Sequence, residues 1–295
     1  MQRFLDPSVL AGISGLDLVA KTVVDGFVAG LHRSPDFGFS QEFAEYRAYV
    51  PGDDLRHVDW NLFARTERCY LKRYRGETNS QLVILLDASN SMQYTSGPPT
   101  KMDYARFVAA SLFYLAIRNQ RDAAGLIVFD DEVRDYVRPS TRQGQLARLF
   151  AGLEGAEPRA RTDFGKPLQH FQELLHRRGI AVVISDFYEE PETIVHAIEP
   201  LRFHGNDVVL FHVLDPQEIR PVLKGPALLV DLETEREIEV IPEYAKTAYR
   251  VKIDAHIEQL RSRTQAAGMD YQLLVTDQPL DGALREYLSL RKAGN

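Results

Sequence analysis

The residues best suited to chemistry follow a short apolar run at positions 82–86. This run, Leu-Val-Ile-Leu-Leu, is continuously aliphatic, as is typical of a strand that is buried on both faces. An acid and two hydroxyls follow it at alternate positions, as Asp87, Ser89 and Ser91. Because an open α/β sheet binds ligands at the carboxyl ends of its strands, we predict a divalent-cation site here that serves to bind a partner.

Two other segments add oxygen ligands to this set. Thr162 lies in the loop at residues 161–165, and Asp186 follows a second apolar run at residues 180–184. Since loops at the carboxyl ends of neighbouring parallel strands meet in one crevice, we expect these side chains to converge on Asp87. Hydroxyls, carboxylates and waters make an octahedral oxygen shell that suits Mg²⁺ or Mn²⁺, and less closely Ca²⁺. Ser89, Ser91 or Thr162 alone is more often a helix cap or a loop residue, and Asp87 or Asp186 alone could cap a neighbouring helix, so only the combination favours a metal site.

The elements that must position these ligands alternate between strand and helix from residue 81 onward. We expect strands at residues 82–86, 123–129, 133–137, 180–184, 207–214 and 271–276. Helices are expected from near Thr100, which with Asp103 resembles a capping box, and at residues 145–153, 166–177, 191–203, 242–267 and 282–292. This order predicts an α/β fold, namely a doubly wound, mostly parallel sheet of the Rossmann type with helices on both faces.

Two additions to this sheet are predicted. Residues 1–79 form an N-terminal segment with a helix up to about residue 31, which is broken near Gly12–Gly15, and residues 80–295 form the α/β domain. Within that domain, an insertion at about residues 216–241 carries an amphipathic β-hairpin.

Residues 33–80 combine arginines, acids and aromatics around the turn sequence Pro-Gly-Asp-Asp at 51–54. A short helix is expected through residues 59–63. The segment is either an ordered, salt-bridged cover over one edge of the sheet or a dedicated interaction surface, since binding hot spots and buried anchors use the same residue types. The candidate partner-binding residues are Arg47, Asp53, Asp54, Arg56, Asp59, Trp60 and Arg65.

The predicted ligands resemble the metal-ion-dependent adhesion site of von Willebrand factor A-type domains. That pattern is Asp-x-Ser-x-Ser after the first strand, a Thr in a distant loop and an Asp after the fourth strand. It is matched here at five positions, with Asn90 where Gly is frequent: Asp87, Ser89, Ser91, Thr162 and Asp186. The resemblance implies a von Willebrand factor A-like domain at residues 80–295.

A longer motif resembles the hallmark of a bacterial family catalogued as domain of unknown function number fifty-eight. It is Glu42-Phe43-x-Glu45-Tyr46-Arg47-x-Tyr49-x-Pro51-Gly52-Asp53-Asp54-x-Arg56-x-x-Asp59-Trp60-x-x-x-Ala64-Arg65. The resemblance extends from about Gly38 to the last helix. It implies association with a MoxR-type AAA+ ATPase in a chaperone-like system for maturation or stress response. Some relatives carry N-terminal membrane helices, which this sequence lacks.

The composition excludes several classes of protein. The net charge of −7 and the pI near 5.7 argue against general affinity for nucleic acids, although residues 65–75 are locally basic. A single cysteine, Cys69, excludes an internal disulfide and a cysteine-based zinc site. No stretch approaches the roughly 18–20 apolar residues of a membrane-spanning helix. Since the layout of a signal peptide is also lacking, we expect a cytoplasmic protein without stable membrane insertion.

We therefore expect a non-enzymatic, metal-dependent protein-binding module. Its partner would be the ATPase, a client protein, or both, bound through an acidic residue that completes the metal shell. The alternative is an Mg²⁺-dependent phosphohydrolase with Asp87 as nucleophile. Haloacid-dehalogenase-like enzymes of that kind need a second acid two residues further on, where this chain has Ser89.

Overall fold

The computed structural model describes most of the chain, namely residues 6–31, 43–49, 58, 60–66, 68–74, 81–159, 167, 178–203, 205–230 and 237–293. Two compact units are present: Met1–Phe27 together with Ser80–Asn295, and Val28–Asn79. Residues 1–27 thus belong to the same unit as the sheet, whereas residues 1–79 were predicted to form one N-terminal segment. Within the described ranges, no helix combines the length and the apolar character needed to span a bilayer.

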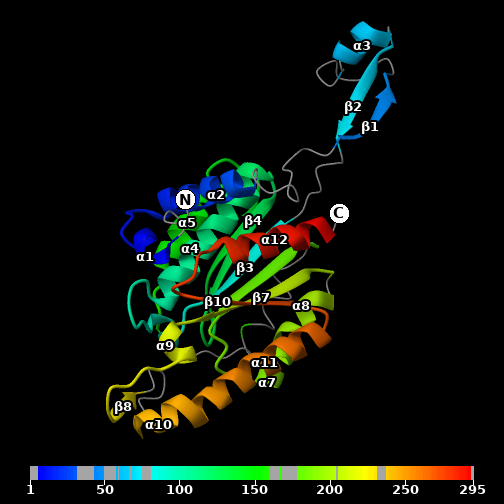
Figure 1. The fold of residues 1–295 in the computed structure, drawn as a ribbon. Helices are drawn as coiled ribbons and strands as arrows, with labels where there is room; N and C mark the ends of the chain where they lie inside the picture. The colour runs from blue at the N-terminus through cyan, green and yellow to red at the C-terminus, as the bar shows by residue number, and fades with distance from the viewer. Residues whose placement is uncertain are drawn as a thin grey trace. The chain divides into compact units, whose positions relative to one another are not determined.

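A six-stranded sheet forms the centre of the larger unit (Figure 1). In spatial order its strands are β10 (Asp270–Val275), β7 (Asp207–Leu214), β6 (Ile180–Ser185), β3 (Gln81–Asp87), β4 (Ala123–Phe129) and β5 (Val133–Ser140). The first five are parallel, and β5 is antiparallel to β4 at one edge. The predicted doubly wound, mostly parallel sheet is therefore confirmed.

The two strands next to each other at the centre, β3 and β6, are buried along their whole length. Helices cover both faces of a parallel sheet, so a central strand needs apolar side chains at successive positions, not only at alternate ones. This requirement explains the unbroken aliphatic runs at residues 82–86 and 180–184.

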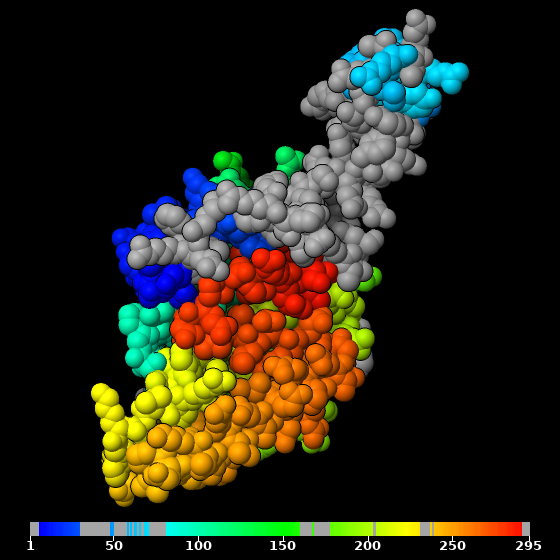
Figure 2. Space-filling view, viewed as in Figure 1, coloured from blue at the N-terminus to red at the C-terminus, as the bar shows by residue number. Residues whose placement is uncertain are grey.

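Helices lie on both faces of the sheet (Figure 1). One face carries α4 (Lys101–Tyr114), α5 (Gln145–Gly155) and α12 (Asp281–Ala293), and the other carries α7 (Pro191–Ile198), α8 (Pro200–Phe203) and α11 (Arg250–Ala266). In Figure 2, α11 (orange) and α12 (red) form much of the visible surface of this unit. The predicted cap of α4 is confirmed, because Thr100 Oγ1 accepts a hydrogen bond of 3.0 Å from the Asp103 amide.

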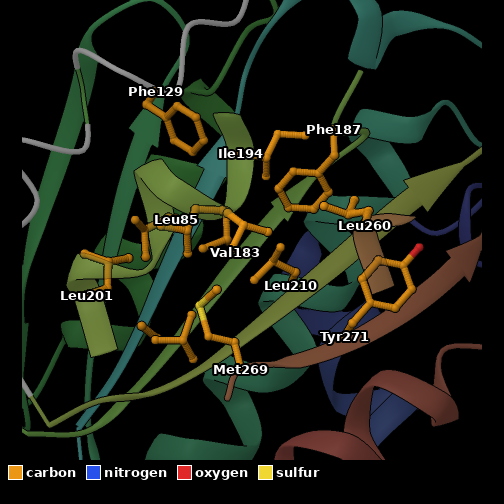
Figure 3. Close-up of a cluster of buried hydrophobic side chains, with 14 of the residues drawn as sticks. Leu85, Phe129, Val183, Phe187, Ile194, Leu201, Leu210, Leu260, Met269 and Tyr271 are labelled. Carbon is orange, nitrogen blue, oxygen red and sulfur yellow. The ribbon is translucent and has the colours of Figure 1, made fainter. Parts of the chain in front are cut away.

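One layer of the core lies between the sheet and the α7–α11 side (Figure 3). All five parallel strands contribute apolar side chains to it, which pack with Ile194 of α7 and Leu260 of α11. Strand β3 contributes Val83 and Leu85, which are two residues apart. Because alternate side chains of a strand point to opposite faces, the intervening buried residues face the α4 side.

The remaining elements of the larger unit are short or follow one another closely. At the N-terminus, α1 (Pro7–Leu10) and α2 (Leu16–Leu31) are separated near Gly15, which has a φ of 90° and confirms the predicted break. The helical turns η3 (Asn90–Gln93) and η4 (Leu115–Asn119) lie before and after α4, and α9 (Pro216–Ile219) follows β7. The predicted hairpin is present as β8 (Ala227–Val230) and β9 (Glu237–Val240), and α10 (Pro242–Tyr244), η5 (Ala245–Tyr249) and α11 then follow in immediate succession.

The smaller unit contains two antiparallel strands and one helix. Strand β1 (Phe43–Ala48) pairs with β2 (Tyr70–Tyr74), and α3 (Trp60–Thr66) lies between them in sequence. The short helix near Trp60 was predicted, whereas the strand pair was not. Its strands are separated by more than twenty residues of chain, so no hairpin turn marks the pairing in the sequence.

Candidate metal-binding site

The candidate site lies at the carboxyl ends of β3 and β6. Numbered along the chain within the sheet, the strand order corresponds to the 3-2-1-4-5-6 order of doubly wound folds, with β3 first and β6 fourth. These two strands are neighbours, with Leu86 opposite Ile184. Chain connections leave them in opposite directions, which opens the crevice where such sheets bind ligands. Asp87 is the last residue of β3 and Asp186 directly follows β6, so both lie at the carboxyl ends of the strands that border this crevice, as the sequence predicted.

Three of the predicted ligands are brought together at the end of β3. Asp87 Oδ1 accepts a 2.8 Å hydrogen bond from the Ser89 amide, and the hydroxyls of Ser89 and Ser91 are 2.9 Å apart. All three side chains are buried. Ser89 is extended and η3 begins at the next residue, so the chain turns back and places both hydroxyls together. One carboxylate and two hydroxyls therefore lie close together at the end of β3.

Ser185 belongs to this cluster and was missed by the sequence analysis. Its hydroxyl donates a 2.5 Å hydrogen bond to Asp87 Oδ2 and accepts one of 3.0 Å from the Phe187 amide. Ser185 therefore fixes the orientation of the Asp87 carboxylate. The sequence holds a weak indication of it, since Ser185 ends the strand that is followed by the predicted ligand Asp186.

Asp186 takes part in a buried ion pair that was also missed. Lys101 Nζ lies 2.7 Å from Asp186 Oδ2 and 2.7 Å from Glu218 Oε1. The Lys101 side chain is 0% exposed and that of Asp186 is 2% exposed. A lysine at the first position of a helix opposes the helix dipole, and this mismatch is the one feature in the sequence that marks Lys101 as unusual.

The charges in this crevice change the proton affinities of its groups. Burial, followed by the negative charge of Asp186, raises the pKa of Asp87 from 3.8 to about 7, although hydrogen bonds from Ser185 and Ser89 oppose the change. Burial lowers the pKa of Lys101, but Asp186 and Glu218 more than offset this effect and leave the pKa above its usual value. A cation at Asp87 would favour the ionised form of this carboxyl.

The turn that carries Asp186 is held by aromatic and imidazole side chains. Phe187 has a φ of 46°, and its carbonyl oxygen lies 2.8 Å from His256 Nε2. His212 packs edge-on against Phe187, and its Nδ1 lies 2.7 Å from the Tyr271 hydroxyl. Burial, and then the neighbouring His256, lower the pKa of His212 to about 3, so this ring is neutral at pH 7. These contacts support the backbone next to the candidate ligand.

The fifth predicted ligand, Thr162, lies outside the described residues, as do Asp53, Asp54, Arg56 and Asp59. The described chain reaches Arg159, whose amide donates a 2.9 Å hydrogen bond to the Ala88 carbonyl, three residues before Thr162. Ser89 and Arg159 form a parallel bridge. The chain that follows Asp87 therefore lies beside Arg159, the last described residue before Thr162.

The other predicted partner-binding residues belong to the smaller unit. Arg47 lies on β1, and Trp60 and Arg65 lie on α3. The Trp60 side chain is 57% exposed, and its ring meets that of Phe63 edge-on at 6.0 Å between centroids. Arg65 is also exposed.

The donor set fits a hard cation. Carboxylate and hydroxyl oxygens are the ligands that Mg²⁺, Mn²⁺ and Ca²⁺ prefer, and the Asp87, Ser89 and Ser91 side chains present both. Within the described ranges, no three or more His, Cys, Asp and Glu side chains gather as a group that could hold a metal ion. A metal at this site would therefore depend on hydroxyl ligands, as the predicted pattern requires.

The sheet order, the antiparallel edge strand and the helices on both faces define a von Willebrand factor A-like α/β protein. A family model described as "Protein of unknown function DUF58" matches residues 45–265. The chain belongs to this family, as its sequence motif predicted. Uncharacterized proteins of Mycobacterium tuberculosis and Mycobacterium bovis are 26% identical over 295 residues, which cover 98% of this chain and 92% of each relative.

Two solved structures from Bacteroides species show the same fold at low sequence identity. The conserved hypothetical protein BatB from Bacteroides thetaiotaomicron matches with a TM-score of 0.50 and 16% identity, over 72% of this chain and 99% of that chain. An aerotolerance-related membrane protein from Bacteroides fragilis matches with a TM-score of 0.52, 16% identity and the same coverage of 72% and 99%. The SpRpn10 VWA domain matches with a TM-score of 0.44 and 15% identity, over 70% of this chain and 94% of that domain.

Proposed function

We propose that this chain is a non-enzymatic protein-binding module that uses a divalent cation, Mg²⁺ in the first instance, to hold an acidic side chain of its partner. The observation that carries the proposal is the buried oxygen cluster of Asp87, Ser89 and Ser91 at the crevice between β3 and β6. Asp186 and Thr162 complete the proposed ligand set. Mn²⁺ and Ca²⁺ satisfy the same donor chemistry.

The charge balance of the cluster favours a ligand from outside. Ser89 and Ser91 are neutral, and Asp186 shares its charge with Lys101. A divalent cation held mainly by Asp87 would thus keep positive charge. A carboxylate from a partner would neutralise the remaining positive charge of the cation. Since a buried carboxylate needs an opposite charge, the partner would bind strongly only when the metal is present.

The class of partner follows from the family resemblance. That resemblance implies a MoxR-type AAA+ ATPase, and we propose that the module joins this ATPase, or a client of it, in chaperone-like maturation or a stress response. The exposed Trp60 and Arg65 are residue types that dominate binding energies at protein interfaces. We propose that they provide a second contact, together with Arg47 and the Pro-Gly-Asp-Asp segment.

The same cluster supports binding better than phosphoryl transfer. An aspartyl nucleophile of the haloacid-dehalogenase-like kind needs a general acid two residues further on. Ser89 occupies that position, and its hydroxyl is engaged with the Ser91 hydroxyl. We therefore propose coordination, without covalent chemistry, as the role of Asp87.

The test is affinity purification of the ATPase with the wild-type chain and with Asp87→Ala, each in Mg²⁺ and in chelator. Of these four samples, we expect only the wild type in Mg²⁺ to retain the ATPase. The matched control is Asp207→Ala. Asp207 is the first residue of β7, so this variant removes an aspartate at the amino ends of the strands, away from the site, and should retain the ATPase. Equal retention by the wild type in chelator would contradict the metal-mediated contact, and hydrolysis of a generic phosphate ester that is lost with Asp87→Ala would favour the enzyme.

A further inference from the structure

Lys101 holds a position that a purely structural ion pair does not require. It is the first residue of α4, its side chain is fully buried, and its ammonium bridges two carboxylates, that of Asp186 after β6 and that of Glu218 in α9. The rings of Tyr188 and Tyr94 lie 4.8 Å and 5.8 Å from Lys101 Nζ. A buried ammonium is costly unless it is paired, so Lys101 must keep at least one carboxylate partner at all times.

The two carboxylates differ in what else they do. Asp186 is a proposed metal ligand and lies next to the Asp87 cluster. Glu218 is fixed independently of Lys101, because its Oε2 accepts a 2.8 Å hydrogen bond from the Asp215 amide in the capping box of α9. Asp215 is itself held by the amides of Gln217 and Ser96. Glu218 therefore remains in place as a partner for Lys101 when Asp186 is needed elsewhere.

We propose that Lys101 is a built-in competitor of the metal ion for Asp186. In the metal-free protein the ammonium shares Asp186 with Glu218; when a divalent cation is bound, repulsion between the two positive charges leaves Lys101 with Glu218 alone. Lys101 thereby sets the metal affinity of the site and keeps it low in the absence of a partner carboxylate. This inference rests on the proposed metal-dependent function and adds the residue that regulates it.

The test is a double-mutant cycle on metal affinity, measured by calorimetric titration of Mn²⁺ into the full chain. Lys101→Met removes the competitor and should tighten binding by about tenfold, as expected for an energetic coupling of ordinary size. Glu218→Gln retains the acceptor for the Asp215 amide, but takes away the alternative charge partner of Lys101. The Lys101 ammonium then stays on Asp186, and Mn²⁺ binding should weaken by a similar factor.

The double variant separates competition from a general effect of charge. If Glu218 acts through Lys101, Glu218→Gln changes nothing in the Lys101→Met background. If both residues act only through the net charge of the crevice, Glu218→Gln weakens binding to the same extent in either background, which overturns the proposal. Circular dichroism checks that each variant is folded, and should Lys101→Met fail to fold, Lys101→Gln, which also removes the ammonium, takes its place in the cycle.

The outcomes also distinguish this inference from the proposed function. In one outcome, Mn²⁺ binding is lost with Asp87→Ala but is equal in the wild type, Lys101→Met and Glu218→Gln. This result overturns the competitor role and leaves the metal-dependent function standing. Binding by Lys101→Met together with none by the wild type supports competition. An absence of Mn²⁺ binding in every variant refutes both.

Discussion

Replacement of Asp87 by asparagine should stabilise the metal-free protein at alkaline pH, although it removes a proposed ligand. Asparagine has nearly the same shape and carries no charge. The pKa of Asp87 is raised from 3.8 to about 7 by burial and by Asp186, so the folded state retains a proton that the unfolded state has already lost. Between pH 3.8 and about pH 7 the unfolded chain binds fewer protons than the folded protein, so the stability of the wild type falls as pH rises.

The magnitude follows from the same linkage. Stability contributed by this group is fully present below about pH 4 and is lost progressively up to about pH 7. The slope is about 1.4 kcal/mol per pH unit, so the complete loss over the roughly 3.2 pH units between the two pKa values has an upper bound of about 4–5 kcal/mol. The Asp87→Asn substitution would also disturb the hydrogen bond from Ser185, at a cost of about 1 kcal/mol that does not depend on pH. The free energy of unfolding of Asp87→Asn relative to the wild type should therefore rise by roughly 2–3 kcal/mol between pH 5 and pH 8.

The assay is urea denaturation in chelator at pH 5, 6, 7 and 8, followed by far-ultraviolet circular dichroism. Fluorescence is less suitable, because the single tryptophan, Trp60, lies in the smaller unit. Saturating Mg²⁺ at about 100 times its dissociation constant should add about 2.7 kcal/mol to the wild type and nothing to Asp87→Asn. A stability difference between the two proteins that stays constant from pH 5 to pH 8 would refute the electrostatic reasoning.

Two further predictions concern the core and the smaller unit. Leu85→Ala should lower the free energy of unfolding by about 2–5 kcal/mol, because Leu85 is fully buried under the α7–α11 layer. Urea denaturation measures the change, and Val251→Ala, at a position 69% exposed, is the control that should leave the midpoint unaltered. Trp60→Ala should weaken ATPase association by about 2 kcal/mol, as for an interface hot spot, and leave Mn²⁺ affinity unchanged. Surface-binding measurements of ATPase affinity compare Trp60→Ala with Leu18→Ala, a control at a position 51% exposed in the larger unit. An equal loss of affinity in both variants would show that Trp60 is not part of the interface.

Much of the larger unit was predictable because its elements are marked by local patterns. The aliphatic runs of β3 and β6 stand out from the polar segments around them, and Thr100 with Asp103 marks the start of α4. The β8–β9 hairpin is marked by alternation around a short polar connection. The pairing of β1 with β2 was not marked in this way, since the strands are distant in sequence and α3 lies between them.

In the candidate site, too, the contacts between residues close in sequence were predictable, and those between distant residues were not. Asp87, Ser89 and Ser91 lie within one turn of chain, so their spacing alone predicted that they would meet. Ser185 and Lys101 reach the site from 98 and 85 residues away from their partners Asp87 and Asp186. No local pattern encodes contacts over such separations, and they depend on which strands are neighbours in the sheet.

The sequence by itself determined the central strands, the oxygen ligands at the end of β3, the second acid after β6 and the family motif. Only the tertiary structure decided that β6 lies beside β3, that Ser185 orients Asp87, and that a buried lysine shares Asp186 with Glu218. The physical reason is that periodicity and capping are set by residues a few positions apart. The burial and pairing of a charged side chain are set instead by the elements that pack around it, and here these are β3, β6, α4 and α9.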